Sequence, residues 1–232
     1  MSFNLLIAGI NVNIYLEGSM RNILKDIQIR KELKRYKLFK NCYKFSQKEL
    51  IEKDGKKYLG DICVQDDKSN QCVNEGDTFI NVGYKLSGAL PKVLSNLFPY
   101  EFYFRGFKLS SVESFFQGIK FRNRKTQKLV FSYSGVNAYR IKVAQDYDWK
   151  ANQTIYFMGK GYERNSQAYE DLVDKLYVSL LQNPLYVNAL KNVGDKYILH
   201  SMGVTDPRET VFTRYEFEKQ LNCLKEYCIK YK

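Results

Sequence analysis

Helix-start signals recur along the second half of this sequence, and they constrain its fold more than any other feature. Asn183-Pro184 places a capping residue before a proline, in the order that helices prefer. Thr213 followed by Glu216 is a capping-box pattern. Apolar side chains recur at helical spacing after Ser166. These signals predict helices over residues 136–145, 166–182 and 184–192, another start at Asp206-Pro207, and a last helix over 214–228.

The first third of the chain shows a different pattern. Short apolar segments bounded by turn residues predict strands over residues 3–16, 56–64 and 78–82. The intervening residues fit a basic helix over 20–35 and a polar loop over 66–76. We therefore expect an α+β fold, mostly helical with a small sheet, and a domain boundary near Asp77. Its two parts are a basic α/β amino-terminal extension, residues 1–78, and a main domain, residues 79–232.

The formal net charge is +12, and much of it is local. Residues 21–57 hold thirteen Lys or Arg and five Asp or Glu, a difference of +8. A basic segment of this kind favours polyanionic partners such as nucleic acid or phosphate-bearing small molecules. The alternative is a basic protein whose charge serves solubility alone.

Several common classes of site are missing from the sequence. The only histidine is His200 and the five cysteines form no CxxC pair, which argues against a zinc site. Neither GxSxG nor GxxxxGK[ST] is present, and Gly159-Lys160-Gly161 lacks the rest of a dinucleotide fingerprint. The opening residues read as a strand rather than as a signal or a membrane span. We expect a cytoplasmic protein with reduced thiols, no membrane contact, no metal and no cofactor.

The segment from residue 94 to residue 121 holds the best candidate for chemistry. Glu113, Gln117 and Lys120 fall within about 60° of arc on a helix, a single polar stripe. The neighbouring face is apolar and aromatic, with Val112, Phe115, Phe116 and Ile119. An acid, an amide and an amine beside an aromatic wall indicate a reactive site. The competing interpretation is structural, because Ser110 to Glu113 is also a capping-box pattern and the other two polar residues suit a solvated surface.

Two further segments are predicted to close this site. The first, residues 148–164, carries Trp149, Tyr156 and Arg164. The second, residues 200–209, carries His200, Asp206 and Arg208. Structural roles compete here too, because the tryptophan and the histidine suit a protein core and the aspartate suits a helix cap.

Short motifs follow one another in a fixed order between residues 80 and 228. They are Leu94-Ser95-Asn96-Leu97-Phe98-Pro99, Gly106, Ser111-Val112-Glu113, Gln117-Gly118-Ile119-Lys120-Phe121, Trp149 with Gln153, Ser166 with Tyr169, Asn183-Pro184, Ala189-Leu190 and Leu199-His200-Ser201. Each motif is short, but their order and spacing are specific when taken together. In this arrangement the sequence resembles the NADAR family, the YbiA-like N-glycosidases, in the branch that carries a DPxET ending.

The sequence departs from the family pattern at three places. Ser114 stands where many members have a histidine, and Gly118 stands where alanine is usual. Asp206-Pro207-Arg208 replaces the D-x-x-W-G run of the bacterial riboflavin-intermediate glycosidases. Glu113 and Lys120 are both retained, so the departures bear on the substrate more than on the activity.

The resemblance implies an α+β enzyme that cleaves a ribosyl C–N bond. It implies that Glu113 stabilises the sugar cation or activates water, and that Lys120 protonates the leaving base or captures the opened ribose as a Schiff base. The other substrate contacts that we expect are Asn96 and Gln117 on ribose hydroxyls, Arg164 or Arg208 on phosphates, Trp149 or Tyr156 on the base, and His200 and Asp206 nearby.

Three functions are compatible with these expectations. The leading one is removal of ADP-ribose from ADP-ribosylated guanine in nucleic acid. The second is cleavage of riboflavin-pathway ribosylamine phosphates, and the third is a non-catalytic module that sequesters ADP-ribose or an NAD-derived signal. The expected partner is therefore ADP-ribosylated nucleic acid or an ADP-ribose-like small molecule.

Overall fold

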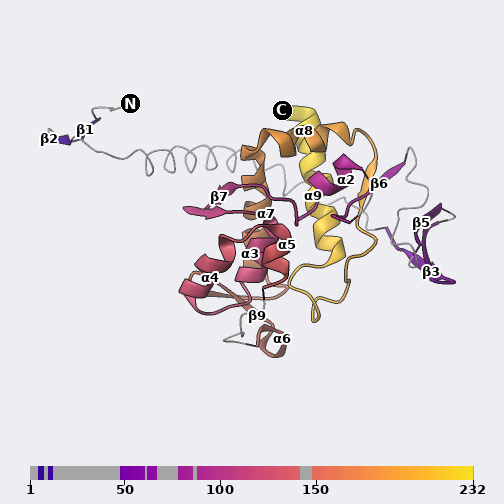
Figure 1. Ribbon diagram of the computed structural model, residues 1–232, viewed down its shortest axis with the longest axis horizontal. Coiled ribbons are helices and arrows are strands. Elements are labelled where there is room, and N and C mark those ends of the chain that lie inside the picture. The colour runs from indigo at the N-terminus through magenta and orange to yellow at the C-terminus, as the bar shows by residue number, and fades with distance from the viewer. Residues whose placement is uncertain are drawn as a thin grey trace.

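The structure is a computed structural model that describes residues 5–7, 10–12, 48–60, 62–66, 78–85, 88–141 and 148–231. Helices and short strands alternate through this part of the chain (Figure 1), and the predicted α+β class is confirmed. The basic helix expected over residues 20–35 and nearly all of the polar loop expected over 66–76 lie outside the described residues. The proposed domain boundary near Asp77 stays a prediction.

The strands of the described residues pair into small separate sheets. The antiparallel sheets are β1 (Leu5–Ile7) with β2 (Ile10–Val12), β3 (Ile51–Lys53) with β4 (Lys56–Leu59) and β5 (Ile62–Asp66), β7 (Phe102–Phe104) with β8 (Phe107–Leu109), and β9 (Thr154–Phe157) with β10 (Lys160–Glu163). The remaining pair, β6 (Phe79–Asn81) with β11 (Tyr197–Leu199), is parallel. The single strand expected over 56–64 is instead a hairpin, because the chain turns at Gly60 with a φ of +61°.

The helices follow the predicted capping signals closely. Ser166 Oγ accepts from the Tyr169 N–H, and Asn183 Oδ1 accepts from the Leu185 N–H. Thr213 and Glu216 form the reciprocal capping box. The helices of the described residues are α2 (Ala89–Val93), α3 (Val112–Gly118), α4 (Arg124–Phe131), α5 (Gly135–Tyr139), α6 (Trp149–Asn152), α7 (Gln167–Ser179), the 3-10 helix η2 (Leu180–Gln182), α8 (Pro184–Asn192) and α9 (Arg214–Tyr231).

The helix start expected at Asp206-Pro207 is wrong. Residues 206–209 form a turn, in which the Glu209 N–H donates to the Asp206 carbonyl. The Asp206 carboxylate accepts from the backbone and the guanidinium of Arg208, so the cap closes on its own turn and no helix follows.

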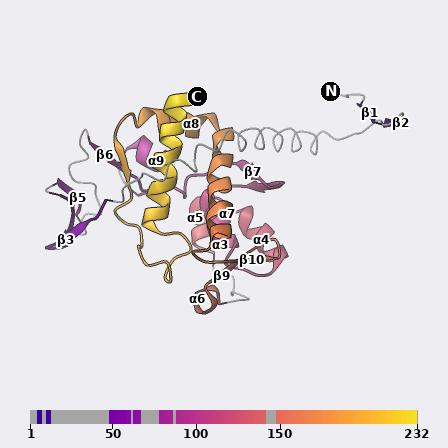
Figure 2. The same cartoon turned by 180° about the vertical axis from the view of Figure 1, so that it is seen from behind.

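Helix α3 lies in the middle of the main core, where α4 and α5 pack against it. Its Phe115 and Ile119 are fully buried. The long helices α7 and α9 run side by side next to this group in both views (Figures 1 and 2), and Gln220 of α9 donates to Asp174 of α7. No helix of the described residues has the length and apolar character needed to cross a membrane. Cys223 is disulfide-bonded, so the expectation of reduced thiols is wrong at that residue.

The hairpin β4–β5 packs against the edge of the main core. Val64 forms a small buried cluster with Phe79 of β6 and Leu199 of β11. Lys57 Nζ donates to the Ser201 carbonyl at 3.0 Å. These contacts tie the segment before residue 78 to the strand that leads into residues 200–203.

We expect Val64→Ala to lower the free energy of unfolding by about 1–3 kcal/mol, because it leaves a cavity between β5, β6 and β11. Denaturant titration followed by circular dichroism measures the change. Ile62→Ala is the matched control, since Ile62 lies on the same strand but is 37% exposed. Equal effects of the two substitutions would contradict the packing of β5 on the core.

Candidate functional site

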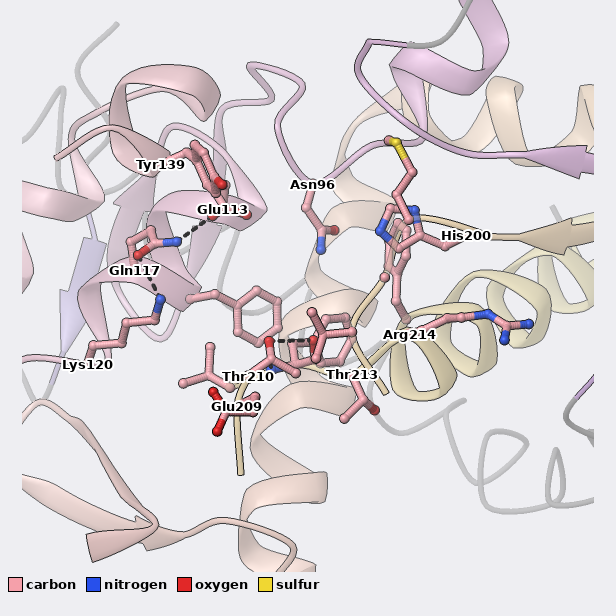
Figure 3. Close-up of a pocket in the computed structure, with 17 residues that line it drawn as sticks. Asn96, Glu113, Gln117, Lys120, Tyr139, His200, Glu209, Thr210, Thr213 and Arg214 are labelled. Carbon is pink, nitrogen blue, oxygen red and sulfur yellow. Dashed lines mark hydrogen bonds between the residues drawn. The ribbon is translucent and has the colours of Figure 1, made fainter. Parts of the chain in front are cut away.

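A pocket of about 390 Å³ opens between α3, α5 and the chain from residue 200 to the start of α9 (Figure 3). The polar groups of α3 lie on one wall, and residues 200–217 form the opposite wall. The lining residues are Asn96, Glu113, Phe116, Gln117, Lys120, Tyr139, His200, Met202, Gly203, Val204, Glu209, Thr210, Val211, Phe212, Thr213, Arg214 and Phe217. The predicted stripe of Glu113, Gln117 and Lys120 therefore faces a cavity rather than bulk solvent.

The start of α3 leaves the Glu113 carboxylate available to this pocket. Ser111 is the N-cap, and its Oγ accepts from the N–H groups of Ser114 and Gly135. The Ser110 N–H, which a capping box would pair with Glu113, donates instead to the Phe131 carbonyl at 3.1 Å. The capping-box alternative for Glu113 is therefore wrong, because a different serine caps the helix and the expected donor is already bonded.

Two polar side chains of α3 and Lys120, which lies in the turn directly after this helix, form a continuous hydrogen-bonded chain (Figure 3). Lys120 Nζ donates to Gln117 Oε1 at 2.9 Å, and Gln117 Nε2 donates to Glu113 Oε1 at 2.6 Å. The amide of Gln117 thus links the amine to the acid, one helical turn apart on each side. Since Gln117 occupies Oε1, the second carboxylate oxygen of Glu113 remains for a ligand.

Burial shifts both ionisable ends of this chain toward their neutral forms. Desolvation raises the pKa of Glu113, while the hydrogen bond from Gln117 and the charge of Lys120 oppose the rise. Desolvation lowers the pKa of Lys120, the charge of Glu113 opposes this, and Lys150 adds to it. An acid and an amine displaced toward each other in pKa are suited to proton transfer near neutral pH.

Asn96 and His200 enter the pocket from the opposite side to Lys120. Asn96 Oδ1 accepts from the Tyr177 hydroxyl at 2.6 Å, which turns the amide nitrogen toward the cavity (Figure 3). His200 Nδ1 lies 2.7 Å from the Val82 carbonyl, so the proton belongs on Nδ1 and Nε2 is the acceptor. Burial lowers the pKa of His200, which keeps the ring neutral.

Stacked aromatic rings form the floor between these polar groups. Phe116 and Phe212 lie 4.4 Å apart with an interplanar angle of 17°. Phe212 stacks in turn on Tyr177 at 5.5 Å and 26°. Flat rings at the base of a polar pocket suit a ligand that carries a planar base or a sugar face.

The loop that supplies Phe212 is fixed by buried partners underneath it. Arg164 Nε donates to the Thr210 carbonyl, and the Tyr169 hydroxyl donates to the Val211 carbonyl. On the solvent side, Lys150 Nζ forms an ion pair with Glu209 at 2.6 Å. These contacts hold residues 209–212 against the pocket.

Five of the ten predicted site residues line the pocket: Asn96, Glu113, Gln117, Lys120 and His200. The other five lie elsewhere. Trp149 is a core residue, and Tyr156 lies on β9 beneath the Arg122 guanidinium. Arg164 is buried against Glu216, and Asp206 and Arg208 form an exposed ion pair with each other. Arg164 therefore cannot reach a phosphate in this pocket, because its guanidinium is already paired inside the core.

The structure explains the departures at residues 114 and 118. Ser114 is fully buried and its hydroxyl donates to the Ser111 carbonyl, so it faces the helix start and not the pocket. Gly118 lies against the Phe131 ring, and a Cβ at this position would overlap that ring. Both differences therefore adjust the packing of α3 and leave its polar stripe unchanged.

Several lining residues had no recognisable signal in the sequence. Tyr139 ends α5, and Thr210 and Phe212 lie in an irregular loop, where neither helical nor strand periodicity applies. Glu209 ends the segment 200–209 that was expected to close the site, but no role in the site was predicted for it. Within the described residues, no cluster of His, Cys, Asp and Glu has an arrangement that could hold a metal ion.

Comparisons with known proteins find a family, a phage relative and a solved structure that are similar to this chain. Residues 89–226 match the family described as "Bacteriophage protein GP30.3". A relative from Enterobacteria phage T4, "Uncharacterized 17.1 kDa protein in Gp30-rIII intergenic region", is 29% identical over 137 residues, which are 57% of this chain and 88% of the relative. The solved NMR structure of the E. coli protein YbiA aligns with a TM-score of 0.39 and 15% identity, over 66% of this chain and 84% of that one.

The matched family model covers more than half of the chain and includes α3, the loop that carries Phe212 and most of α9. It is of NADAR type, so the resemblance seen in the motifs is confirmed. Such a family indicates a glycosidase-like or related function. The chain belongs to the bacteriophage GP30.3 family of NADAR-type proteins.

Proposed function

We propose that this protein is an N-glycosidase that hydrolyses a ribosyl C–N bond and removes ADP-ribose from ADP-ribosylated guanine in nucleic acid. One observation carries the proposal. A partly buried acid and a partly buried amine are joined through an amide by hydrogen bonds, and all three side chains face a pocket that aromatic rings also line. Family membership supports the reaction class.

Cleavage of a ribosyl C–N bond places positive charge on the anomeric carbon and the ring oxygen in the transition state. The free oxygen of the Glu113 carboxylate would stabilise that charge and then accept a proton from the attacking water. The bonding pair of the broken C–N bond goes to the base, the water oxygen bonds to the anomeric carbon, and the base nitrogen gains a proton.

Lys120 can serve this reaction in two ways. As an ammonium group it donates the proton that the leaving base nitrogen gains. As a neutral amine, which its lowered pKa favours, it bonds to the anomeric carbon of the opened ribose and forms a Schiff base that water later hydrolyses. Borohydride distinguishes the two routes, because it reduces only a Schiff base to a stable protein–sugar adduct.

The opposite wall supplies the groups that would orient the sugar. The Asn96 amide nitrogen is a donor and His200 Nε2 is an acceptor, a pair that suits adjacent ribose hydroxyls. The stacked rings of Phe116 and Phe212 would support the sugar or the base. Together these contacts would place the anomeric carbon between Glu113 and Lys120.

The function is tested by incubating the protein with an oligonucleotide that carries ADP-ribosylated guanine and measuring the release of free ADP-ribose by mass spectrometry. A ribosylamine phosphate of the riboflavin pathway is the second substrate in the same assay. Turnover of the oligonucleotide alone supports the proposal. Turnover of only the small phosphate would assign the same chemistry to a different substrate, and tight binding of ADP-ribose with no turnover would indicate a sequestering module.

The pH profile tests the hydrogen-bonded chain directly. Activity requires ionised Glu113, so the acid limb of kcat/KM should lie above the usual range of a glutamate, because burial raises its pKa. Gln117→Met removes the bond that opposes this rise, so the limb should move to still higher pH. Asn137→Met is the matched control, since Asn137 is an exposed residue of α5 outside the pocket lining, and it should leave the limb in place. An unshifted limb in Gln117→Met would contradict the role of the amide.

A further inference from the structure

A strongly basic surface adjoins the proposed active site. Between residues 102 and 141 the chain holds eight Lys or Arg and one acid, Glu113, so eight minus one gives +7. The acid is partly buried in the pocket wall, where its carboxylate accepts from Gln117. Four exposed members of this region and of the adjoining β10 define what we call the basic ridge: Arg122, Arg124, Lys125 and Lys160.

The basic ridge is continuous with the pocket wall. Lys120 lines the pocket, and Arg122 follows two residues later with its guanidinium 5.3 Å from the Tyr156 ring. The buried Gln127 amide joins the segment before Arg122 to strand β9, because it donates to the carbonyls of Phe121 and Tyr156. The ridge therefore starts next to Lys120, the last residue of the polar stripe, and the Gln127 amide supports it from below.

The second half of the ridge is equally well supported. The Arg124 guanidinium lies against Gly159, where an added Cβ would overlap it, and the φ of +89° at Gly159 also favours glycine. Lys160 follows directly, with its Nζ 5.0 Å from the Tyr162 ring. The turn between β9 and β10 thus places Lys160 beside Arg124 and Lys125 of α4.

The placement of these cations does not favour the helix that carries them. Arg124 and Lys125 are in the first turn of α4, which contains no acid. The positive end of the helix dipole destabilises cations there, and the Asn123 side chain already caps the free N–H groups. An external polyanion would offset this unfavourable charge.

We propose that the basic ridge binds the phosphate backbone of the nucleic acid strand that carries the modified base. The inference rests on the proposed function and names the surface through which a strand would be held beside the pocket. Cations beside aromatic side chains are the combination that binds single strands without sequence preference. The ridge supplies this combination from the described residues, independently of the basic segment 21–57.

The test compares two variants of equal charge. One replaces Arg122, Arg124, Lys125 and Lys160 with glutamine. The control replaces exposed lysines on other elements with glutamine: Lys53, Lys92, Lys191 and Lys230. A fluorescein-labelled, unmodified single-stranded DNA of about twelve nucleotides is titrated with each protein over a range of salt concentrations, and anisotropy reports binding.

We expect the ridge variant to lose at least tenfold in affinity at low salt. The slope of log affinity against log salt should fall by about 2–3, since each phosphate contact with a single strand contributes roughly 0.7. The control should change affinity less than twofold. Equal losses in the two variants, or wild-type binding by the ridge variant, would overturn the proposal. Lys125→Gln with Lys160→Gln leaves the contacts to Tyr156 and Gly159 in place and should give about half the slope change.

Cleavage assays separate this inference from the proposed function. The ridge variant should cleave the ADP-ribosylated strand at least tenfold less efficiently, while cleavage of ADP-ribosyl-guanosine, which has no flanking backbone, changes less than twofold. A wild-type protein that binds the strand through the ridge but cleaves neither substrate would support the ridge and contradict the function. Equal, salt-independent cleavage of strand and nucleoside would support the function and overturn the ridge.

Discussion

Replacing Glu113 with glutamine, or Lys120 with alanine, should lower kcat for release of ADP-ribose by about 10²–10⁴-fold, the usual contribution of a positioned acid or base. Glu113→Gln keeps the size of the side chain and its bond with Gln117 but removes the negative charge. Lys120→Ala removes the proton donor or the amine nucleophile. Single-turnover assays on the modified oligonucleotide measure the chemical step directly.

Both substitutions should leave the fold intact, because desolvation outweighs the attraction between the two charges and they are joined through Gln117 rather than by a direct ion pair. Glu101→Gln and Lys128→Ala are the controls, since both residues are exposed and lie outside the pocket. Unchanged single-turnover rates in both Glu113→Gln and Lys120→Ala would remove the site assignment. Loss of activity in the controls would show that the activity depends on the overall charge of the protein and not on the polar stripe.

Arg164→Ala should lower the free energy of unfolding by about 3–5 kcal/mol, because it breaks a buried ion pair and leaves the partner uncompensated. The Arg164 side chain is fully buried and bonds both oxygens of Glu216, at 2.8 and 2.5 Å. It also holds the Thr210 carbonyl behind the pocket. For a domain of this size the melting temperature should fall by roughly 6–20 °C.

The same variant separates two interpretations of Arg164. If Arg164 bound a phosphate of the substrate, its replacement would raise KM and leave the melting temperature unchanged. Our structural assignment predicts that the melting temperature falls in Arg164→Ala. Arg164→Lys should not restore it, because lysine cannot form the bidentate bond to a carboxylate. Arg208→Ala is the control, since Arg208 is 78% exposed in its side chain and pairs only with Asp206 at the surface.

The local fold was predictable where a residue type has a strong preference for one position, such as a helix N-cap. Ser166, Asn183 and Thr213 cap helices as expected, because a cap depends on N–H groups only two or three residues away. The same reasoning failed at Asp206, where the carboxylate is captured by Arg208 in its own turn. Local patterns therefore predict possible helix starts but do not show which of them continue.

The sequence predicted that the polar stripe lies on one side of a helix, but not whether that side lines a pocket. Spacing puts Glu113, Gln117 and Lys120 on one side of a helix whatever the rest of the chain does. Whether Glu113 caps the helix or serves a pocket depends on where the Ser110 N–H finds its partner, and that partner is the carbonyl of Phe131, 21 residues further along the chain. No spacing rule contains that information.

The sequence by itself determined the α+β class, the helix caps, the polar stripe and, through motif order, the family. The tertiary structure alone decided which residues share the pocket with that stripe. It brought Phe212 and Tyr139 into the lining and withdrew Trp149 and Arg164 into the core. The physical reason is that caps and faces depend on neighbours in sequence, whereas pocket walls depend on long-range packing of irregular loops, whose buried partners lie tens of residues away.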